Sequence, residues 1–106
     1  MEEITSESWS NKVLQEPAAA CFIYSPLCGT CGLAERMLLP MEILYSDISY
    51  YKLNINYIPE LIKSEKITSV PCLKLFSYGE VKRTIYAFTS VPLLSEEIER
   101  FYKLIN

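Results

Sequence analysis

Residues 18–39 read AAACFIYSPLCGTCGLAERMLL, and this stretch decides the fold. It begins with an apolar run, Ala18 to Tyr24, without the polar alternation of a half-exposed strand, which is typical of a strand buried on both faces. A break at Ser25-Pro26 precedes the tetrapeptide Cys28-Gly29-Thr30-Cys31, and residues 29–45 then carry apolar side chains at helical spacing. A C-x-x-C pair between a strand and a helix, in a chain without secretory features, is typical of a redox pair.

Composition and charge narrow the class of protein. At 106 residues, half of them apolar, we expect a single domain over residues 1–106 with one hydrophobic core. The net charge of −3 is mild, and no Lys/Arg block indicates nucleic acid or a membrane surface as a partner. The acidic N-terminus lacks the basic region of a signal peptide, so we expect a cytoplasmic protein, in which a disulfide is usually catalytic or transient.

The absence of histidine from the sequence excludes two further classes of site. Histidine is the commonest base of serine and cysteine hydrolases, and it completes the mixed Cys/His zinc sites. We therefore expect neither a mixed Cys/His zinc site nor a histidine-dependent hydrolase centre, and we assign no metal-binding residues.

Hydrophobic periodicity predicts alternating helices and strands, then a hairpin and a last helix. The predicted helices are 6–15, capped by Ser6 or Ser8, then 29–45, 58–66 with Pro59 in its first turn, and a segment capped by Ser90. The predicted strands are 18–24, 50–55, 72–76 and 81–86, the last two joined at Tyr78-Gly79, where the glycine supplies a positive φ. A βαβ unit followed by a hairpin predicts an α/β fold with a four-stranded mixed sheet between helices.

One apolar stripe is expected to turn the 29–45 helix toward the core. Its members follow helical spacing: Leu33, Ala34, Met37, Leu38, Met41, Leu44 and Tyr45. Pro40 lies inside this pattern, so we expect a kinked helix.

Four features together make the chain resemble the thioredoxin family. They are the strand followed by CGTC at the start of a helix, Pro40 within that helix, the segment Lys52-Leu53-Asn54-Ile55-Asn56, and Val70-Pro71 ahead of the hairpin. The resemblance implies the thioredoxin fold and a thiol–disulfide oxidoreductase that acts as a protein-disulfide reductase. It also implies no cofactor beyond the redox-active Cys28–Cys31 disulfide, and a monomer whose partners are protein disulfide substrates and a recharging reductase.

The sequence also departs from the family's pattern. Leu27 stands where the family has a tryptophan, Phe22 where it has a buried acid, Ala87 where it has a glycine, and Thr30 replaces the motif's proline. We therefore expect a divergent, thioredoxin-like protein.

The chemistry of the dithiol assigns different roles to its two sulfurs. The attacking group in disulfide exchange is a thiolate, which a helix N-terminus stabilises, so Cys28 is the predicted nucleophile. Cys31, one turn further and more buried, is the predicted resolving thiol, with Gly29 and Thr30 supporting the first turn.

The resemblance adds the substrate-binding residues. It implies that Pro71 is cis and that it presents the backbone of Val70 to an extended substrate strand, while Leu27 forms part of an apolar rim.

The replacement of the family's buried acid by Phe22 affects two predictions, one for Cys31 and one for Lys52. In the family the acid is thought to help deprotonate the resolving cysteine, so we expect slower resolution by Cys31. Without that partner, Lys52 should extend to solvent or lose its proton.

Two other functions remain open from the sequence. The first is a non-catalytic thioredoxin-like binding module or redox sensor, and the second is a metal or iron–sulfur binder through Cys28 and Cys31 across a dimer. Only Cys21 and Cys72 could complete a four-thiolate site within one chain, and we expect both to be core residues.

Overall fold

Five strands form one mixed sheet in the order β1-β3-β2-β4-β5. The structure is a computed structural model that describes residues 1–57, 60 and 64–106. The strands are β1 (Glu2–Glu3), β2 (Ala19–Tyr24), β3 (Ser49–Asn54), β4 (Cys72–Ser77) and β5 (Glu80–Ile85). Strand β2 pairs parallel with β3 and antiparallel with β4, which confirms the predicted mixed sheet.

The fifth strand, β1, corrects the prediction of four. Glu2 and Glu3 pair parallel with Tyr51 and Lys52 of β3. Two consecutive acidic residues show no apolar alternation, so the sequence carries no signal for this strand. Its position depends on the rest of the sheet already being in place.

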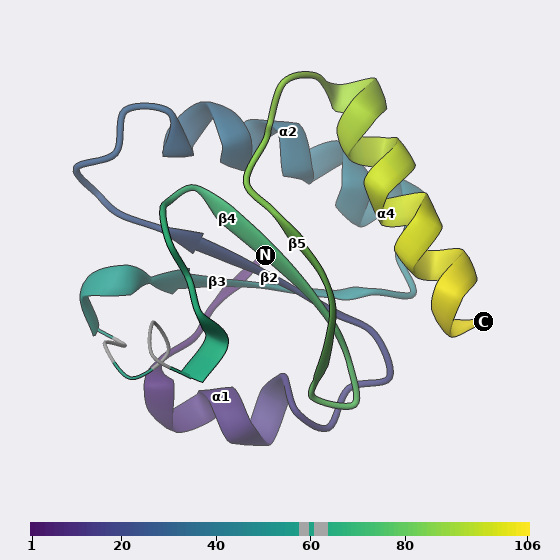
Figure 1. The fold of residues 1–106 in the computed structure, drawn as a ribbon, viewed down its shortest axis with the longest axis horizontal. Helices are drawn as coiled ribbons and strands as arrows, with labels where there is room; N and C mark the ends of the chain where they lie inside the picture. Colours follow the sequence, from purple (N-terminus) through teal and green to yellow (C-terminus); the bar gives the residue numbers. More distant parts are fainter. Residues whose placement is uncertain (58–59, 61–63) are drawn as a thin grey trace.

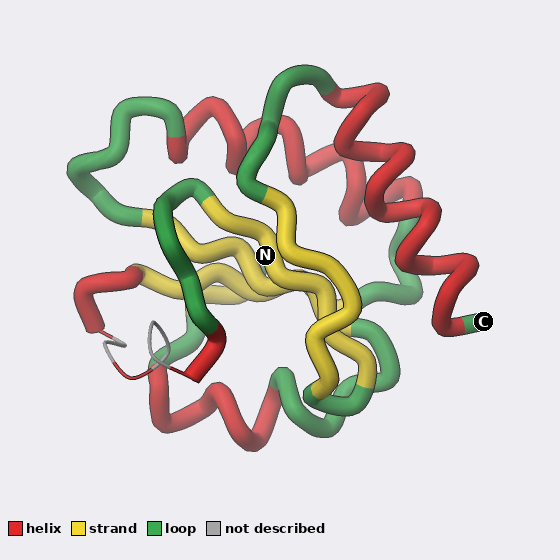
Figure 2. Tube along the Cα trace, viewed as in Figure 1, coloured by secondary structure: helices red, strands yellow, loops and turns green. Residues whose placement is uncertain are grey.

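Helices cover both faces of the sheet, as Figures 1 and 2 show. Helices α2 (Cys31–Leu44) and α4 (Val91–Ile105) lie on one face, and α1 (Ser6–Lys12) lies on the other. A 3-10 turn, η1 (Ile55–Tyr57), follows β3 and was not predicted. The predicted 58–66 helix falls largely on residues outside the described part of the chain, namely 58, 59 and 61–63.

Strand β2 is buried on both faces, as its apolar run predicts. Ala20 and Phe22 belong to the hydrophobic cluster beneath α2 and α4, whereas Cys21 and Ile23 belong to the cluster beneath α1. None of these four side chains is more than 1% exposed. The alternation of β2 between two cores explains why it contains no polar residue before Tyr24.

Helix α2 buries a narrower face than predicted. Cys31, Ala34, Leu38 and Met41 are buried, but Leu33 and Leu44 are 53% and 65% exposed. Each residue turns a helix by about 100°, so Leu33 and Leu44 fall beyond the face that meets the sheet. Pro40 lies inside α2, as expected.

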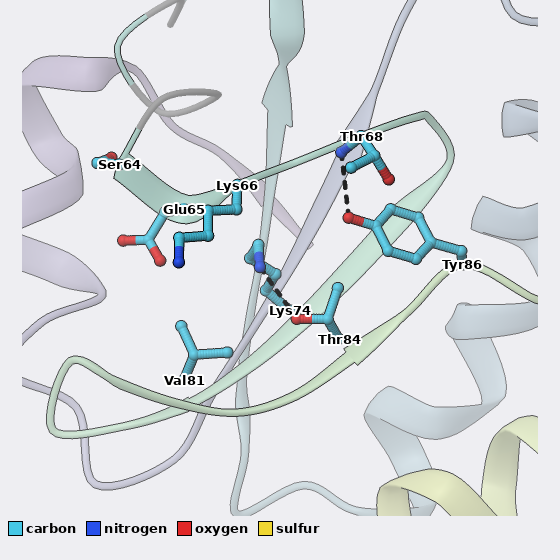
Figure 3. A pocket seen from close by; sticks show the side chains of 8 residues that line it. All are labelled: Ser64, Glu65, Lys66, Thr68, Lys74, Val81, Thr84 and Tyr86. Carbon is cyan, nitrogen blue, oxygen red and sulfur yellow. Dashed lines mark hydrogen bonds between the residues drawn. The ribbon is translucent and has the colours of Figure 1, made fainter.

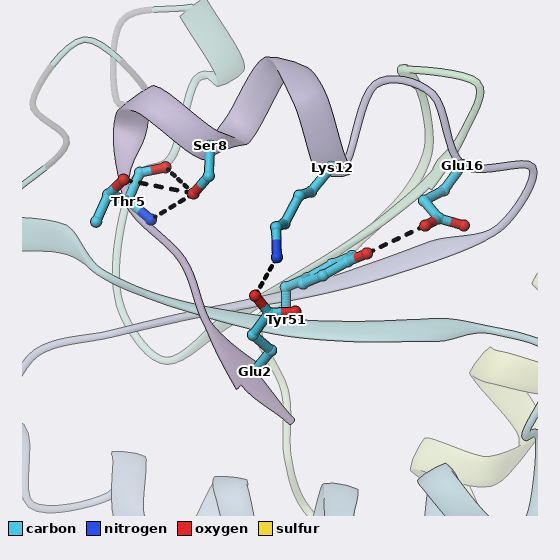
Figure 4. Close-up of polar contacts among 6 residues, drawn as sticks. All are labelled: Glu2, Thr5, Ser8, Lys12, Glu16 and Tyr51. Atoms are coloured by element: carbon cyan, nitrogen blue, oxygen red, sulfur yellow. Dashed lines mark hydrogen bonds and ion pairs between the residues drawn. The ribbon is translucent and has the colours of Figure 1, made fainter.

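Polar contacts hold the N-terminal segment against β3 (Figure 4). Lys12 of α1 forms an ion pair with Glu2, and the hydroxyl of Tyr51 donates to Glu16 Oε1 at 3.1 Å. The cap of α1 is Thr5 rather than Ser6 or Ser8, and its backbone N–H donates to Ser8 Oγ at 3.0 Å. These contacts keep β1 and α1 on the sheet although neither is long.

The hairpin between β4 and β5 turns at Tyr78 and Gly79. Both residues have positive φ, 49° and 81°, which is the pattern of a type I′ turn. A Cβ placed on Gly79 would lie 3.0 Å from Leu14 Cδ2. The glycine is therefore required by its φ and by a close neighbour.

We expect Gly79→Ala to lower the free energy of unfolding by about 1–3 kcal/mol, because alanine is strained at this φ. Urea unfolding measures the change. The matched control is Gly32→Ala in the first turn of α2, where a Cβ has no neighbour within 4 Å. There the better helix propensity of alanine should raise stability by up to about 1 kcal/mol. Equal stability of Gly79→Ala and the parent protein would contradict this account.

Candidate active site

Cys28 and Cys31 form a disulfide, with their Cα atoms 5.4 Å apart, within the normal range. Cys31 is the first residue of α2 and only 3% exposed. Cys28 lies in the turn before the helix and is half-buried. The two sulfurs therefore differ in access, and Cys28 is the one that a second molecule can reach.

The turn that carries Cys28 is fixed by short-range hydrogen bonds. The Cys28 backbone N–H donates to Ser25 O at 3.1 Å, and the Cys31 N–H donates to Cys28 O at 3.3 Å. The helix begins at Cys31, two residues later than predicted, with Thr30 as its N-cap. Cys28 thus lies just outside a helix N-terminus, where unpaired N–H groups and the helix dipole favour a negative sulfur.

The side chain of Thr30 lies next to the sulfur of Cys28. Its Oγ1 is 3.5 Å from Cys28 Sγ. A hydroxyl at this place can donate a hydrogen bond to a thiolate, which the proline of the family's usual motif cannot do.

The loop before β4 reaches the dithiol from a distant part of the sequence. The Val70–Pro71 peptide bond is cis, as predicted. The carbonyl oxygen of Val70 lies 3.9 Å from Cys28 Sγ, although the two residues are 42 positions apart. The register explains this contact, because Ile23 near the end of β2 pairs with Cys72 at the start of β4.

Lys52 is paired, so the prediction of an unpartnered ammonium was wrong. Its Nζ lies 3.1 Å from Glu35 Oε2 of α2, and 5.8 Å from the centre of the Tyr24 ring. Phe22 is directly opposite Lys52 in the sheet and provides no charge. The sequence did not reveal Glu35 because its pairing depends on how α2 lies over β3. The available signal was its spacing, four residues after Cys31.

Cys21 and Cys72 are buried free thiols, which confirms their interpretation as core residues. Both belong to the cluster on the α1 face, whereas Cys31 belongs to the cluster on the α2 face. Burial raises the pKa of Cys21 well above its usual value and raises that of Cys72 to about 11. The sheet therefore separates two unreactive thiols from the redox pair.

A hollow of about 490 Å³ lies on the α1 side of the hairpin (Figure 3). Lys74 lines it, 3% exposed, and donates from Nζ to Thr84 Oγ1 at 2.9 Å. At its rim the Thr68 N–H donates to the hydroxyl of Tyr86 at 3.2 Å. Neither cysteine of the disulfide lines this hollow, so it is separate from the dithiol site.

Within residues 1–57, 60 and 64–106, no group of three or more His, Cys, Asp or Glu side chains is placed to hold a metal ion. In the same part of the chain, no helix combines the length and apolar character needed to cross a membrane.

The family model for thioredoxin matches residues 1–100. The chain belongs to the thioredoxin family. This thioredoxin family member is 38% identical over 87 residues to the thioredoxin-like protein YusE of Bacillus subtilis, and the match covers 82% of each chain. The Cys28–Cys31 disulfide in the C-x-x-C position, together with this family, makes the protein a thiol–disulfide oxidoreductase.

Two further comparisons bear on length and fold. A chloroplastic M-type thioredoxin of Spinacia oleracea is 28% identical over 103 residues, and the match spans 95% of this chain but 57% of the spinach protein. The solution structure of oxidised thioredoxin from Plasmodium falciparum superimposes with a TM-score of 0.82 at 20% identity, covering 95% of this family member and 97% of that chain. The predicted thioredoxin fold is thereby confirmed, with five strands instead of four.

We expect a thiol-alkylating reagent at neutral pH to label Cys28 of the reduced, folded protein and to leave Cys21 and Cys72 unlabelled. Burial shields these two thiols and keeps them protonated, and the thiolate is the reactive form. Peptide mass spectrometry reads the labelling, with the denatured protein as the control in which all four cysteines react. Labelling of native Cys72 as fast as that of Cys28 would contradict the burial argument.

Proposed function

We propose that this oxidoreductase reduces disulfides in other proteins, with Cys28 as the attacking thiol and Cys31 as the resolving thiol. The observation that carries the proposal is the position of Cys28 Sγ. It is the more accessible sulfur, lies outside the N-terminus of α2, and is 3.9 Å from the carbonyl oxygen of Val70. One face of this sulfur is therefore open to a substrate, and the N-terminus of α2 favours its thiolate form.

The reaction runs as two exchanges. The Cys28 thiolate attacks one sulfur of the substrate disulfide, forming a mixed disulfide and releasing the other sulfur as a thiolate, which takes up a proton. Cys31 then loses its proton and attacks Cys28 Sγ, so that the Cys28–Cys31 bond forms and the second substrate thiol leaves. The substrate gains two electrons, and a reductase returns two electrons to the dithiol.

The substrate chain binds in an extended form along Val70. Backbone groups beside a cis-proline can pair with a strand of the substrate, in the manner of β-augmentation. Leu27 is 94% exposed next to Cys28 and offers an apolar contact, while Gly29 and Thr30 support the turn between the two cysteines. Leu27, Val70 and Pro71 are therefore the proposed substrate-binding residues.

The protein works as a single domain over residues 1–106, which the family match over residues 1–100 supports. It acts as a monomer and uses no cofactor beyond the Cys28–Cys31 disulfide. The two free thiols Cys21 and Cys72 are compatible with a reducing compartment such as the cytoplasm, where we place the reaction.

We expect the reduced protein to cleave the interchain disulfides of insulin, and Cys28→Ser to abolish this turnover because the accessible thiol is lost and Cys31, 3% exposed, cannot reach the substrate disulfide. Cys31→Ser should instead accumulate a mixed disulfide with the substrate, visible by non-reducing electrophoresis. If Cys28→Ser still binds a partner protein as tightly as the parent does, the result would favour the alternative function of a non-catalytic binding module. A bound metal or cluster, with a dimer that dissociates on chelation, would favour the metal binder.

We expect Leu27→Ser to raise KM for insulin several-fold while leaving the reaction with a small aromatic disulfide unchanged, because only the protein substrate reaches the apolar rim and the substitution adds no charge beside Cys28. Steady-state kinetics with both substrates measures the difference. Leu104→Ser is the matched control, since Leu104 is also an exposed leucine (63%) but lies near the end of α4. Equal effects of the two substitutions would contradict the role of Leu27.

A further inference from the structure

The resolving step needs a proton acceptor close to Cys31. A thiol attacks a disulfide only after it loses its proton. Cys31 is 3% exposed and packs in an apolar cluster that includes Phe22, Ala34 and Leu38. Water has little access to this sulfur, so the proton must pass to a group of the protein or to a water molecule that such a group holds.

Tyr24 of β2 packs against the hydrophobic cluster that contains Cys31, and a chain of contacts joins it to three charged residues. Lys52 of β3 lies over its ring and pairs with Glu35 of α2, and Glu3 of β1 accepts from its hydroxyl. Burial raises the pKa of Tyr24 to about 12, so its hydroxyl keeps its proton at neutral pH. That hydroxyl donates to both carboxylate oxygens of Glu3, at 2.9 and 2.7 Å, on the outermost strand of the sheet. Glu35 is left as the carboxylate that lies within about one helical turn of Cys31, since the other glutamate of α2, Glu42, lies about two turns further along the helix.

The geometry of α2 directs Glu35 toward Cys31. A residue four positions further along a helix lies about 40° round from the first, on nearly the same side. Helical side chains also lean toward the N-terminus, so the Glu35 side chain covers the turn that begins with Cys31. The ammonium of Lys52, 3.1 Å from Glu35 Oε2, holds the carboxylate on the sheet side of the helix.

We propose that Glu35 accepts the proton of Cys31 during resolution of the mixed disulfide, with Lys52 as the positioning residue. The S–H bond of Cys31 breaks and its proton passes to the Glu35 carboxylate, directly or through one water molecule. The thiolate attacks Cys28 Sγ, the Cys28–Cys31 bond forms, and the bond to the substrate breaks. The departing substrate thiolate carries the electron pair and takes up a proton. This inference rests on the proposed function and names the base for its second step.

The test separates the two exchanges in one reaction. The reduced full-length protein is mixed in a stopped-flow instrument with dithiobisnitrobenzoate, which releases one coloured thiolate when Cys28 attacks and a second when Cys31 resolves. We expect Glu35→Gln to slow the second phase by roughly tenfold to a hundredfold at neutral pH, the low end of what a positioned base contributes. The first phase should be unchanged, because Cys28 does not use Glu35.

The pH profile distinguishes a base from a structural residue. At strongly alkaline pH hydroxide can deprotonate Cys31 without help, so the ratio of parent to Glu35→Gln rates should fall toward one. Glu35→Asp keeps a carboxylate on a shorter side chain and should recover part of the rate. A ratio that stays constant across pH, or no recovery with aspartate, would overturn the proposal.

Two control variants make the same Glu→Gln change as Glu35→Gln at other carboxylates. Glu42 is on α2, seven residues after Glu35, and is also paired with a cation, the N-terminal amine of Met1, at 2.8 Å. Glu42→Gln therefore removes an ion-paired carboxylate from the same helix, two turns further from Cys31, and should leave both phases unchanged. Glu3→Gln should do the same. A second phase slowed equally by any of these controls would assign the effect to net charge or stability and overturn the role of Glu35.

The outcomes also separate this inference from the function beneath it. A parent protein without the two phases, or without turnover of insulin, would remove the proposed function and this proposal together. Two normal phases in the parent, with both retained in Glu35→Gln, would leave the reductase intact and remove only the proton acceptor.

Discussion

Burial of β2 on both faces is the constraint on which the rest of the structure depends. Residues 19–23 are at most 1% exposed, so β2 is held by β3 and β4 in the plane of the sheet and by helices above and below. Because β2 leads directly into the turn of Cys28, its position sets the position of the attacking sulfur. Its antiparallel register with β4 brings Pro71 to the same end of the sheet.

The features that the sequence predicted are those with local causes. The apolar run of β2, the glycine of the hairpin and Ser90, whose side chain accepts from the Leu93 N–H, each follow from the residues around them. The cis-proline and the pairing of the dithiol could be predicted because the motif of a known family places them. Local chemistry and the family resemblance were therefore sufficient to predict the fold and the pairing of Cys28 with Cys31.

The features that the sequence did not predict arise where separate elements meet. Strand β1 exists because β3 offers a partner, not because two glutamates favour a strand. The pair of Lys52 and Glu35 joins a strand to a helix 17 residues away, and neither residue is distinctive alone. Because Phe22 stands where the family has an acid, the sequence suggested that Lys52 has no charged partner. In the structure, Glu35 of α2 provides the carboxylate instead. Such a replacement is visible only after α2 is placed over the sheet.

The charged residues of the outer strands have a further consequence for how the sheet meets other chains. Strand β1 consists of two glutamates, and β5 carries Glu80, Lys82 and Arg83. Charged side chains on outer strands hinder pairing with strands of other molecules. Binding an extended polypeptide beside Val70 uses the same backbone pairing that drives aggregation. The charged outer strands thus protect the two edges of the sheet from strand addition, so that backbone pairing with a substrate beside Val70, as proposed above, would not extend to the sheet as a whole.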